Sequence, residues 1–437
     1  MSFEAALVQF TIPTSGTTID LTDSGFGTPT AALFASTMDT NDSGSGTSED
    51  GANGTAAVHA SICLGATDGT NERVTSAFAE DNVGTTDGYN QRKSDGDVIF
   101  LMDGTGAEDV ALSFNSWITD GVRLDLDNLP ASAIGATCVL FKCDGAFVGD
   151  FDSSGGADDV TTSIGARVVF GFTNFAAINN STASARFIFG NGFAAKDTGA
   201  TIYNVAQCFQ STDNVGNTAV DDIHEVDLLL QNVTGSQTEG GTAVDLMDAD
   251  SVRFTAVVEN SVTGAVGSFL ALDIGETTEV YQAEYQIPTA TGNSANTSPG
   301  FTPAFVGVLA SRQASGSWGT RTSASNAGTH CIGFATGSAA TAQKSHHVRD
   351  DNGAATTAAH NDQTDSLIYM PDDRGRVTAT NIITCDLVSF DANGYTINYT
   401  AVTGDDRQWG FLAIEDDAGG APAVDDTNQG WWGWMHT

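Results

Sequence analysis

Apolar residues in this chain occur in short runs of about four to seven residues, either alternating with polar residues or standing as blocks between turn formers. The runs at 122–126 and 395–399 alternate strictly, as in strands with one buried face. Asp120-Gly121 is typical of a tight turn between strands. No stretch shows helical periodicity over more than about twelve residues. The pattern therefore predicts an all-β protein of many short strands.

A series of strands and turns in the last third of the chain, residues 285–414, recurs twice earlier in the sequence. The opening Ile287-Pro288 matches Ile12-Pro13, although the middle copy lacks this signature. An Asp-Asn step recurs about every 135 residues, which is much longer than a solenoid repeat. The three steps are Asp81-Asn82, Asp213-Asn214 and Asp351-Asn352.

Because each copy is long enough to be a whole domain, we predict three tandem, mutually related β-sandwich domains of jelly-roll-like type. Their predicted boundaries are residues 1–150, 151–279 and 280–418, followed by a tryptophan-rich tail at 419–437. Each domain is expected to bury its own core.

Stretches rich in Gly, Ser and Asp mark the predicted connections. They indicate linkers at residues 145–165 and 274–279 and a long loop at 36–55.

The composition is strongly acidic, with a formal net charge of -39 over 437 residues. Such a surface repels phosphate, so we expect no nucleic-acid partner. No apolar stretch reaches membrane-spanning length, so no membrane insertion is expected. The chain begins without a basic, apolar leader, which predicts folding in a cytoplasm.

The six cysteines form no CxxC pair and no Cys/His metal spacing. Most lie inside apolar strands, so they are interpreted as buried free thiols. Four histidines, His330, His346, His347 and His360, fit no known metal arrangement and are interpreted as exposed loop residues.

Asp150, Asp152 and Asp158 form the candidate calcium site of the sequence, because clustered carboxylates suit Ca²⁺. The stretch lacks the glutamate that closes an EF-hand loop, so a solvated acidic linker is the favoured alternative. The repeated Asp-Asn steps could be Ca²⁺ ligands or residues that cap turns through their side chains. The turn interpretation is favoured. No other cofactor is expected.

No catalytic signature appears in the sequence: it contains no Ser/His/Asp pattern, nucleotide loop or distinctive carboxylate pair. The positions that repeat are turn formers and core residues. We therefore expect a protein that is not an enzyme.

Turn and strand residues at 288–292, 300–303, 351–352, 387–398 and 411–414 carry a resemblance. In these positions the last copy resembles repeat units of structural proteins from tailed-bacteriophage virions. The first copy matches partly, and the middle copy matches only through the internal repeat.

The resemblance implies a virion protein of a tail or head appendage, or of a capsid decoration, assembled in the host cytoplasm. It implies a homo-oligomer that contacts other virion proteins, with host-surface glycan binding through loops as a further role. It transfers no catalytic residues. The competing interpretation is a bacterial surface or matrix adhesin of repeated β-sandwiches, which an export signal would favour.

Three of the six tryptophans, Trp431, Trp432 and Trp434, lie in the tail after Gly419-Gly420. Because burying an aromatic side chain is favourable by about 1.5–3 kcal/mol, something is expected to cover them. They are predicted to dock on a neighbouring subunit or another virion protein. The alternative is that the tail folds back on its own chain.

Overall fold

The computed structural model describes most of the chain up to Asp416. The described residues are 2–38, 59–80, 89–102, 107–153, 156–174, 180–184, 186–212, 220–224, 229–234, 238–257, 266–314, 322–323, 327–337, 342–351, 359–371, 382–402 and 407–416. Within them the chain forms 32 strands and no helix, so the predicted all-β class is confirmed. The described residues also contain no helix long and apolar enough to cross a membrane.

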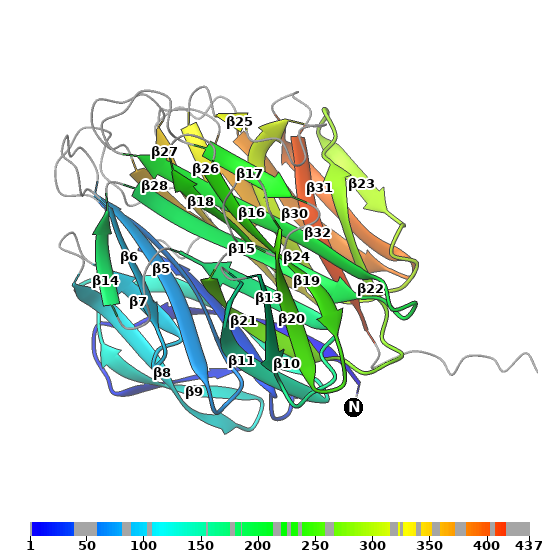
Figure 1. Ribbon diagram of the computed structural model, residues 1–437, viewed down its shortest axis with the longest axis horizontal. Helices are drawn as coiled ribbons and strands as arrows, with labels where there is room; N and C mark the ends of the chain where they lie inside the picture. The colour runs from blue at the N-terminus through cyan, green and yellow to red at the C-terminus, as the bar shows by residue number, and fades with distance from the viewer. Residues whose placement is uncertain are drawn as a thin grey trace, which may run out of the picture.

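The first ten strands, here called the first segment, form two antiparallel sheets (Figure 1). The larger sheet has the order β1 (Glu4–Ile12), β10 (Ile134–Lys142), β3 (Ala31–Thr37), β4 (His59–Thr67), β5 (Glu72–Glu80) and β6 (Tyr89–Ser94). The smaller sheet has the order β2 (Thr18–Thr22), β9 (Gly121–Asn128), β8 (Glu108–Ile118) and β7 (Ile99–Met102).

The middle segment, β11 to β21, repeats this arrangement. Its larger sheet has the order β11 (Gly145–Asp152), β21 (Val266–Asp273), β13 (Val168–Thr173), β15 (Arg186–Lys196), β16 (Ile202–Thr212) and β17 (Val220–His224). Its smaller sheet has the order β12 (Ala157–Thr161), β20 (Ser251–Val257), β19 (Thr238–Met247) and β18 (Leu229–Thr234).

The last segment, β22 to β32, has the same strand order again. Its larger sheet has the order β22 (Val280–Gln286), β32 (Arg407–Glu415), β24 (Pro303–Ala314), β26 (Ala327–Thr336), β27 (Gln343–Asp351) and β28 (Ala359–Thr364). Its smaller sheet has the order β23 (Gly292–Asn296), β31 (Gly394–Ala401), β30 (Ile382–Asp391) and β29 (Ile368–Pro371).

Two further strands join neighbouring segments. β14 (Asn180–Ser184) follows β13 of the middle segment but pairs with β6 of the first segment. β25 (Thr322–Ser323) follows β24 of the last segment but pairs with β17 of the middle segment. In each case a segment adds a strand to the sheet of the preceding segment.

The alternating runs of the sequence form the strands with one buried face, as predicted. Val122, Leu124 and Leu126 of β9 are buried while their neighbours are more accessible, and β31 has the same burial pattern. In contrast, every residue of β3 and of β13 is buried. These central strands are continuous apolar blocks because both of their faces are covered.

Four apolar clusters account for this burial. One cluster lies between the two sheets of each segment, which gives each a β-sandwich-like character. A fourth cluster contains residues from the larger sheets of all three segments. The larger sheets therefore bury one face within their own segment and the other face against the other two segments.

The predicted linker at residues 145–165 is wrong. It contains β11 and β12, and β11 pairs with β21 over its whole length. Val148 and Phe151, which stand among the Gly and Asp residues there, are buried in two different apolar clusters. The linker at 274–279 separates β21 from β22 as predicted. The predicted loop at 36–55 begins inside β3, and its residues 39–55 lie outside the described residues.

Gly65 of β4 and Gly333 of β26 occupy the same place in their segments and allow close sheet contact. A Cβ at Gly65 would lie 2.0 Å from the carbonyl oxygen of Val98, and one at Gly333 would lie 1.8 Å from that of Leu367. Only glycine therefore lets the backbone that leads into the smaller sheet approach so closely.

We expect Gly65→Ala and Gly333→Ala each to lower the free energy of unfolding by about 1–3 kcal/mol, because the backbone must move apart. Urea denaturation measures this. Gly96→Ala is the matched control, since a Cβ there meets no atom within 4 Å. Equal stability of all three variants would contradict the proposed close packing.

Candidate functional site at the junctions between segments

The shared apolar cluster is centred on three phenylalanine rings, one from each segment: Phe141 of β10, Phe170 of β13 and Phe305 of β24. The ring centroids are 5.6 Å apart for Phe141 and Phe170 and 5.6 Å apart for Phe141 and Phe305. The third distance, between Phe170 and Phe305, is 5.8 Å. These distances favour edge-to-face and offset contacts, so each segment completes the core of the other two.

At corresponding positions of this cluster, the three segments carry side chains of different size. The corresponding cross-strand pairs are Phe141–Ala31, Leu272–Val168 and Ile414–Phe305. Two positions after Phe305, a Cβ at Gly307 would lie 3.0 Å from the ring of Phe193 in the middle segment. The three segments are thus fitted to one another and are not interchangeable.

An ion pair joins the first and middle segments. Nε of Arg73 on β5 lies 2.7 Å from Oδ2 of Asp150 on β11, and both side chains are largely buried. The other carboxylate oxygen of Asp150 accepts a hydrogen bond of 2.6 Å from Ser268 Oγ. Both oxygens of Asp150 are therefore engaged in holding this junction.

A buried lysine lies at the same junction. Lys93 is 3% exposed and donates a hydrogen bond of 3.1 Å to the carbonyl oxygen of Val266. Burial lowers the pKa of Lys93 to about 8, against the opposing attraction of Asp150 and Asp152. Asn174 adds two hydrogen bonds from its amide nitrogen to carbonyl oxygens of the first segment.

The junction between the middle and last segments includes contacts of neutral side chains. Gln207 Nε2 donates to the carbonyl oxygen of Ala310 at 2.5 Å. The ring of Phe189 packs edge-on against His330, with centroids 5.1 Å apart. A Cβ at Gly410 would lie 2.5 Å from Val205, so the strands of the two segments meet closely here.

The junction between the last and first segments, here called the seam, closes the ring, and no peptide connection crosses it within the part of the chain that the structure describes. Strands β27 and β28 contact β3 and β4. His346 Nε2 lies 2.8 Å from Thr137 Oγ1, and Gln9 Nε2 donates to the carbonyl oxygen of Gln343 at 2.8 Å. Burial, reinforced by the charge of Lys344, holds the pKa of His346 well below its usual range. His346 is therefore neutral near pH 7.

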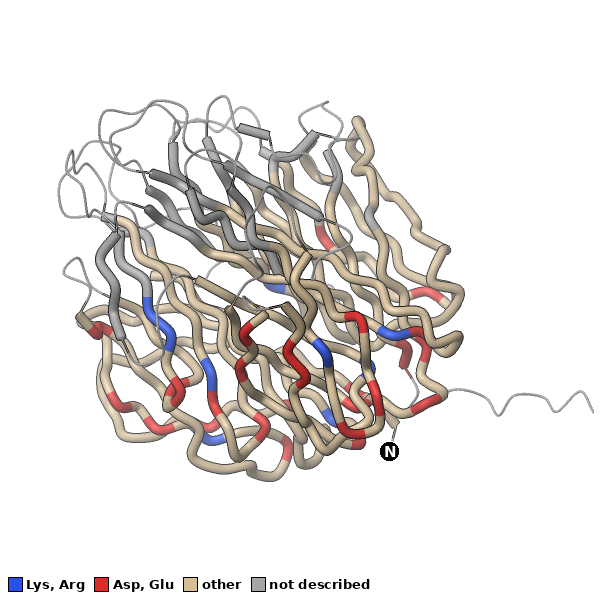
Figure 2. The backbone as a smooth tube through the Cα atoms, viewed as in Figure 1, with Lys and Arg blue, Asp and Glu red and all other residues tan. Residues whose placement is uncertain are grey.

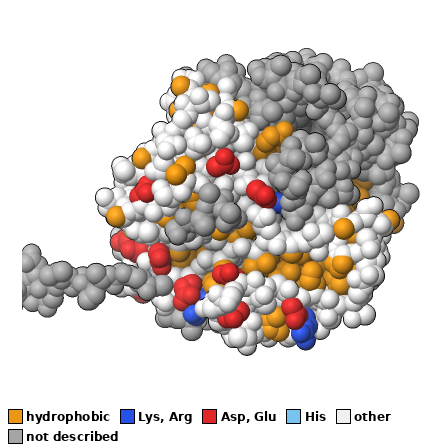
Figure 3. All heavy atoms as spheres, turned by 180° about the vertical axis from the view of Figure 1, so that it is seen from behind, with side chains coloured by type: hydrophobic (Ala, Val, Ile, Leu, Met, Phe, Trp, Pro, Cys, Tyr) orange, Lys and Arg blue, Asp and Glu red, His pale blue; other side chains and the backbone are white. Residues whose placement is uncertain are grey.

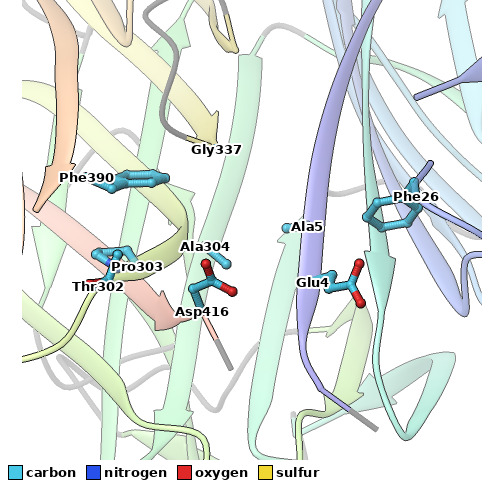
Figure 4. Close-up of a pocket in the computed structure, with 9 residues that line it drawn as sticks. All are labelled: Glu4, Ala5, Phe26, Thr302, Pro303, Ala304, Gly337, Phe390 and Asp416. Atoms are coloured by element: carbon cyan, nitrogen blue, oxygen red, sulfur yellow. The ribbon is translucent and has the colours of Figure 1, made fainter. Parts of the chain in front are cut away.

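A pocket of about 360 Å³ opens at one end of the seam (Figure 4). Its lining residues are Glu4, Ala5, Phe26, Thr302, Pro303, Ala304, Gly337, Phe390 and Asp416. Figure 4 shows Ala5 on one side and Ala304 with the Asp416 carboxylate on the other. The wall combines apolar side chains with the carboxylates of Glu4 and Asp416, which suits an apolar group that carries a hydrogen-bond donor.

The structure does not bring the candidate calcium ligands together as a metal site. Asp150 is held by Arg73 and Ser268, whereas Asp158 Oδ2 accepts a hydrogen bond of 2.8 Å from the backbone nitrogen of Asp152. Among the described residues, no group of three or more His, Cys, Asp or Glu could hold a metal ion. Asp150 instead carries the junction ion pair, which the sequence did not predict.

The interpretation of the histidines as exposed loop residues is wrong for three of them. His330, His346 and His347 lie in strands and are at most 2% exposed. The side chain of His360 lies outside the described residues. All six cysteines are free and buried, as predicted, and burial raises the pKa of Cys63 to about 12.

Other predicted residues are not described. Asp81-Asn82, Asp213-Asn214 and Asn352 lie outside the described residues, as do Trp431, Trp432 and Trp434. Their proposed roles stay predictions.

Sequence reasoning missed the junction residues, although one signal was available. Thr75, Gln207 and His346 are polar residues within strands, at corresponding positions of β5, β16 and β27. Gln207 and His346 contact a neighbouring segment, whereas the buried hydroxyl of Thr75 has no hydrogen-bond partner among the described residues. The shared polar position therefore indicates a junction contact in two of the three copies.

Comparisons with known proteins do not identify a family. No protein-family model matches the chain, and no curated protein matches it. Among solved structures, Acinetobacter baumannii OccAB4 aligns over 95% of this chain and 97% of its own, at 8% identity and a TM-score of 0.11. A likeness this low carries no argument about fold or function.

We expect Arg73→Met to lower the free energy of unfolding by about 2 kcal/mol, because it leaves the carboxylate of Asp150 without its charged partner. Chemical denaturation gives the value. Arg253→Met is the matched control, since the pair of Arg253 and Asp159 is 39% and 59% exposed and should be worth less than about 1 kcal/mol. A larger loss in the control would overturn this ranking.

We expect the seam to weaken in acid through His346. The unfolded chain takes up a proton near pH 6.5, whereas the folded chain keeps His346 neutral to lower pH, so stability falls as pH drops below about 6.5. His346→Gln should therefore flatten the fall in melting temperature between pH 7 and pH 5.

Glu72→Gln provides the comparison of opposite sign. Burial raises the pKa of Glu72 to about 7, so this group contributes stability at low pH that is lost as pH rises from 4.5 towards 7. Unchanged pH profiles in both variants would refute the assignment of these groups.

Proposed function

We propose that the chain is a non-enzymatic structural protein of a bacteriophage virion, in a tail or head appendage or a capsid decoration. In this proposal the first, middle and last segments are three related β-sandwich domains of jelly-roll-like type. The recurrence of one strand order in three pairs of sheets supports the relationship.

The observation that carries the proposal is the apolar cluster shared by the three segments. A chain that unites its segments around one core behaves as a rigid block, which suits assembly into a particle. The junctions place Arg73, Lys93, Asp150 and His346 in contacts that seal the block. In the described residues, these buried or partly buried polar groups therefore serve packing.

The surface charge supports a position on the outside of the particle. Figure 2 shows Asp and Glu distributed along the described strands and turns, with few Lys and Arg among them. Figure 3 shows acidic groups and hydrophobic side chains together on the face turned away from Figure 1. A net charge of -39 keeps the chain soluble and repels packaged nucleic acid.

The proposed partners are other copies of this chain and other virion proteins, with Trp431, Trp432 and Trp434 as a contact element in the assembled particle. Host-surface glycan binding is a further proposed role, and it would fall to the loops.

Purified particles from the source culture test the proposal. We expect peptides of this chain in density-gradient-purified particles at a constant ratio to the major capsid protein, and immunogold label on intact particles. Recovery of the protein in the cell-envelope fraction, with none in particles, would refute the virion role and favour the adhesin. Release of reducing sugar from host polysaccharide by purified protein, abolished by one Asp or Glu substitution, would refute the non-enzymatic role.

A further inference from the structure

The chain itself crosses two of the three junctions, and there it fills the position that corresponds to the seam pocket. Between the first and middle segments, Cys143 leads from β10 towards β11 and is 2% exposed. Thr30 Oγ1 donates to the carbonyl oxygen of Cys143 at 3.0 Å. At the first–middle junction, a buried side chain of the connecting peptide therefore fills the space between the segments.

The connection between the middle and last segments also places a buried side chain at its junction. Ile274 follows β21 and is fully buried. Arg167, which precedes β13 as Thr30 precedes β3, donates from Nη1 to the carbonyl oxygens of Gly275 and Thr278. Cys143 and Ile274 both belong to the shared apolar cluster.

At the seam, no buried side chain of a connecting peptide fills this position in the described residues. Asp416 follows β32 at the position that Cys143 and Ile274 hold after β10 and β21. Ala304 stands where the other segments have Thr30 and Arg167, and both Ala304 and Asp416 line the pocket. At the seam the counterpart of Cys143 and Ile274, Asp416, therefore lines an open pocket, whereas the other two residues are buried in the shared apolar cluster.

We propose that in the free chain the tryptophan segment, residues 431–434, occupies the seam pocket of its own molecule. An indole ring matches the apolar wall of Ala5, Pro303 and Phe390, and its N–H can donate to a carboxylate at the pocket margin. This assignment does not depend on the virion role. The seam pocket shields the tryptophans from water until a partner displaces them.

Chain length favours docking within one molecule. Asp416 lies at the pocket, and residues 417–430 separate it from Trp431. A random-coil chain of 14 residues would span about 20 Å on average, far more than the pocket requires. It presents the tryptophans at an effective concentration of about 1 mM, so the segment of the same chain outcompetes that of a second copy in dilute solution.

Disulfide trapping in the full-length chain tests the proposal. Cysteines are placed by Ala304→Cys in the pocket and Trp432→Cys in the tail, and the six natural cysteines are all buried. Mild oxidation should convert most of the double variant to a cross-linked monomer on a non-reducing gel. The matched control combines Trp432→Cys with Thr161→Cys, an exposed position on β12 outside the pocket, and should cross-link at least five-fold more slowly.

Fluorescence provides a second readout that needs no cross-link. Ala304→Leu fills the pocket and should increase acrylamide quenching of tryptophan fluorescence, whereas Thr161→Leu should not. Equal cross-linking of pocket and control positions, or unchanged quenching in Ala304→Leu, would overturn the proposal. Cross-linked dimers in place of monomers would assign the pocket to the tail of a second copy and would also overturn it.

Discussion

The second buried face of the larger sheets is the constraint on which the rest of this structure depends. A sheet in an ordinary sandwich buries one face and hydrates the other. Here β3 and β13 are buried on both faces because three larger sheets share one apolar cluster. Burial of apolar surface is the main favourable contribution to folding, so none of these sheets is complete without the other two.

Polar contacts give the ring its order. An apolar cluster alone would tolerate several arrangements of three similar segments, since apolar packing is not directional. Each junction instead has its own polar signature: Arg73 with Asp150, Gln207 with a backbone carbonyl, and His346 with Thr137. An unpaired buried charge or amide is costly, so exchanging two segments would lose these contacts. The strands β14 and β25 add backbone pairing between segments, because each pairs with an edge strand of the preceding segment.

The seam differs from the other junctions because no peptide bond crosses it in the described chain. Cys143 and Ile274 are held in place by the connections that contain them, whereas Asp416 follows the last strand beside an open pocket. The seam therefore rests on side-chain and backbone contacts alone within the described residues, and it contains His346, whose pKa is lowered by burial. Local opening is expected to begin where the chain is not continuous.

The sequence by itself determined the all-β class, the alternating faces of strands such as β9 and β31, the connection at residues 274–279 and the burial of the cysteines. These follow from local patterns, because side-chain period and turn residues act over a few positions. Only the tertiary structure decided that residues 145–165 form strands, that Asp150 pairs with Arg73, and that His330 and His346 are buried. Each of these depends on a partner tens to hundreds of residues away. A polar residue in a strand looks the same in the sequence whether it faces water or another segment, and only the packing of the three larger sheets distinguishes the two.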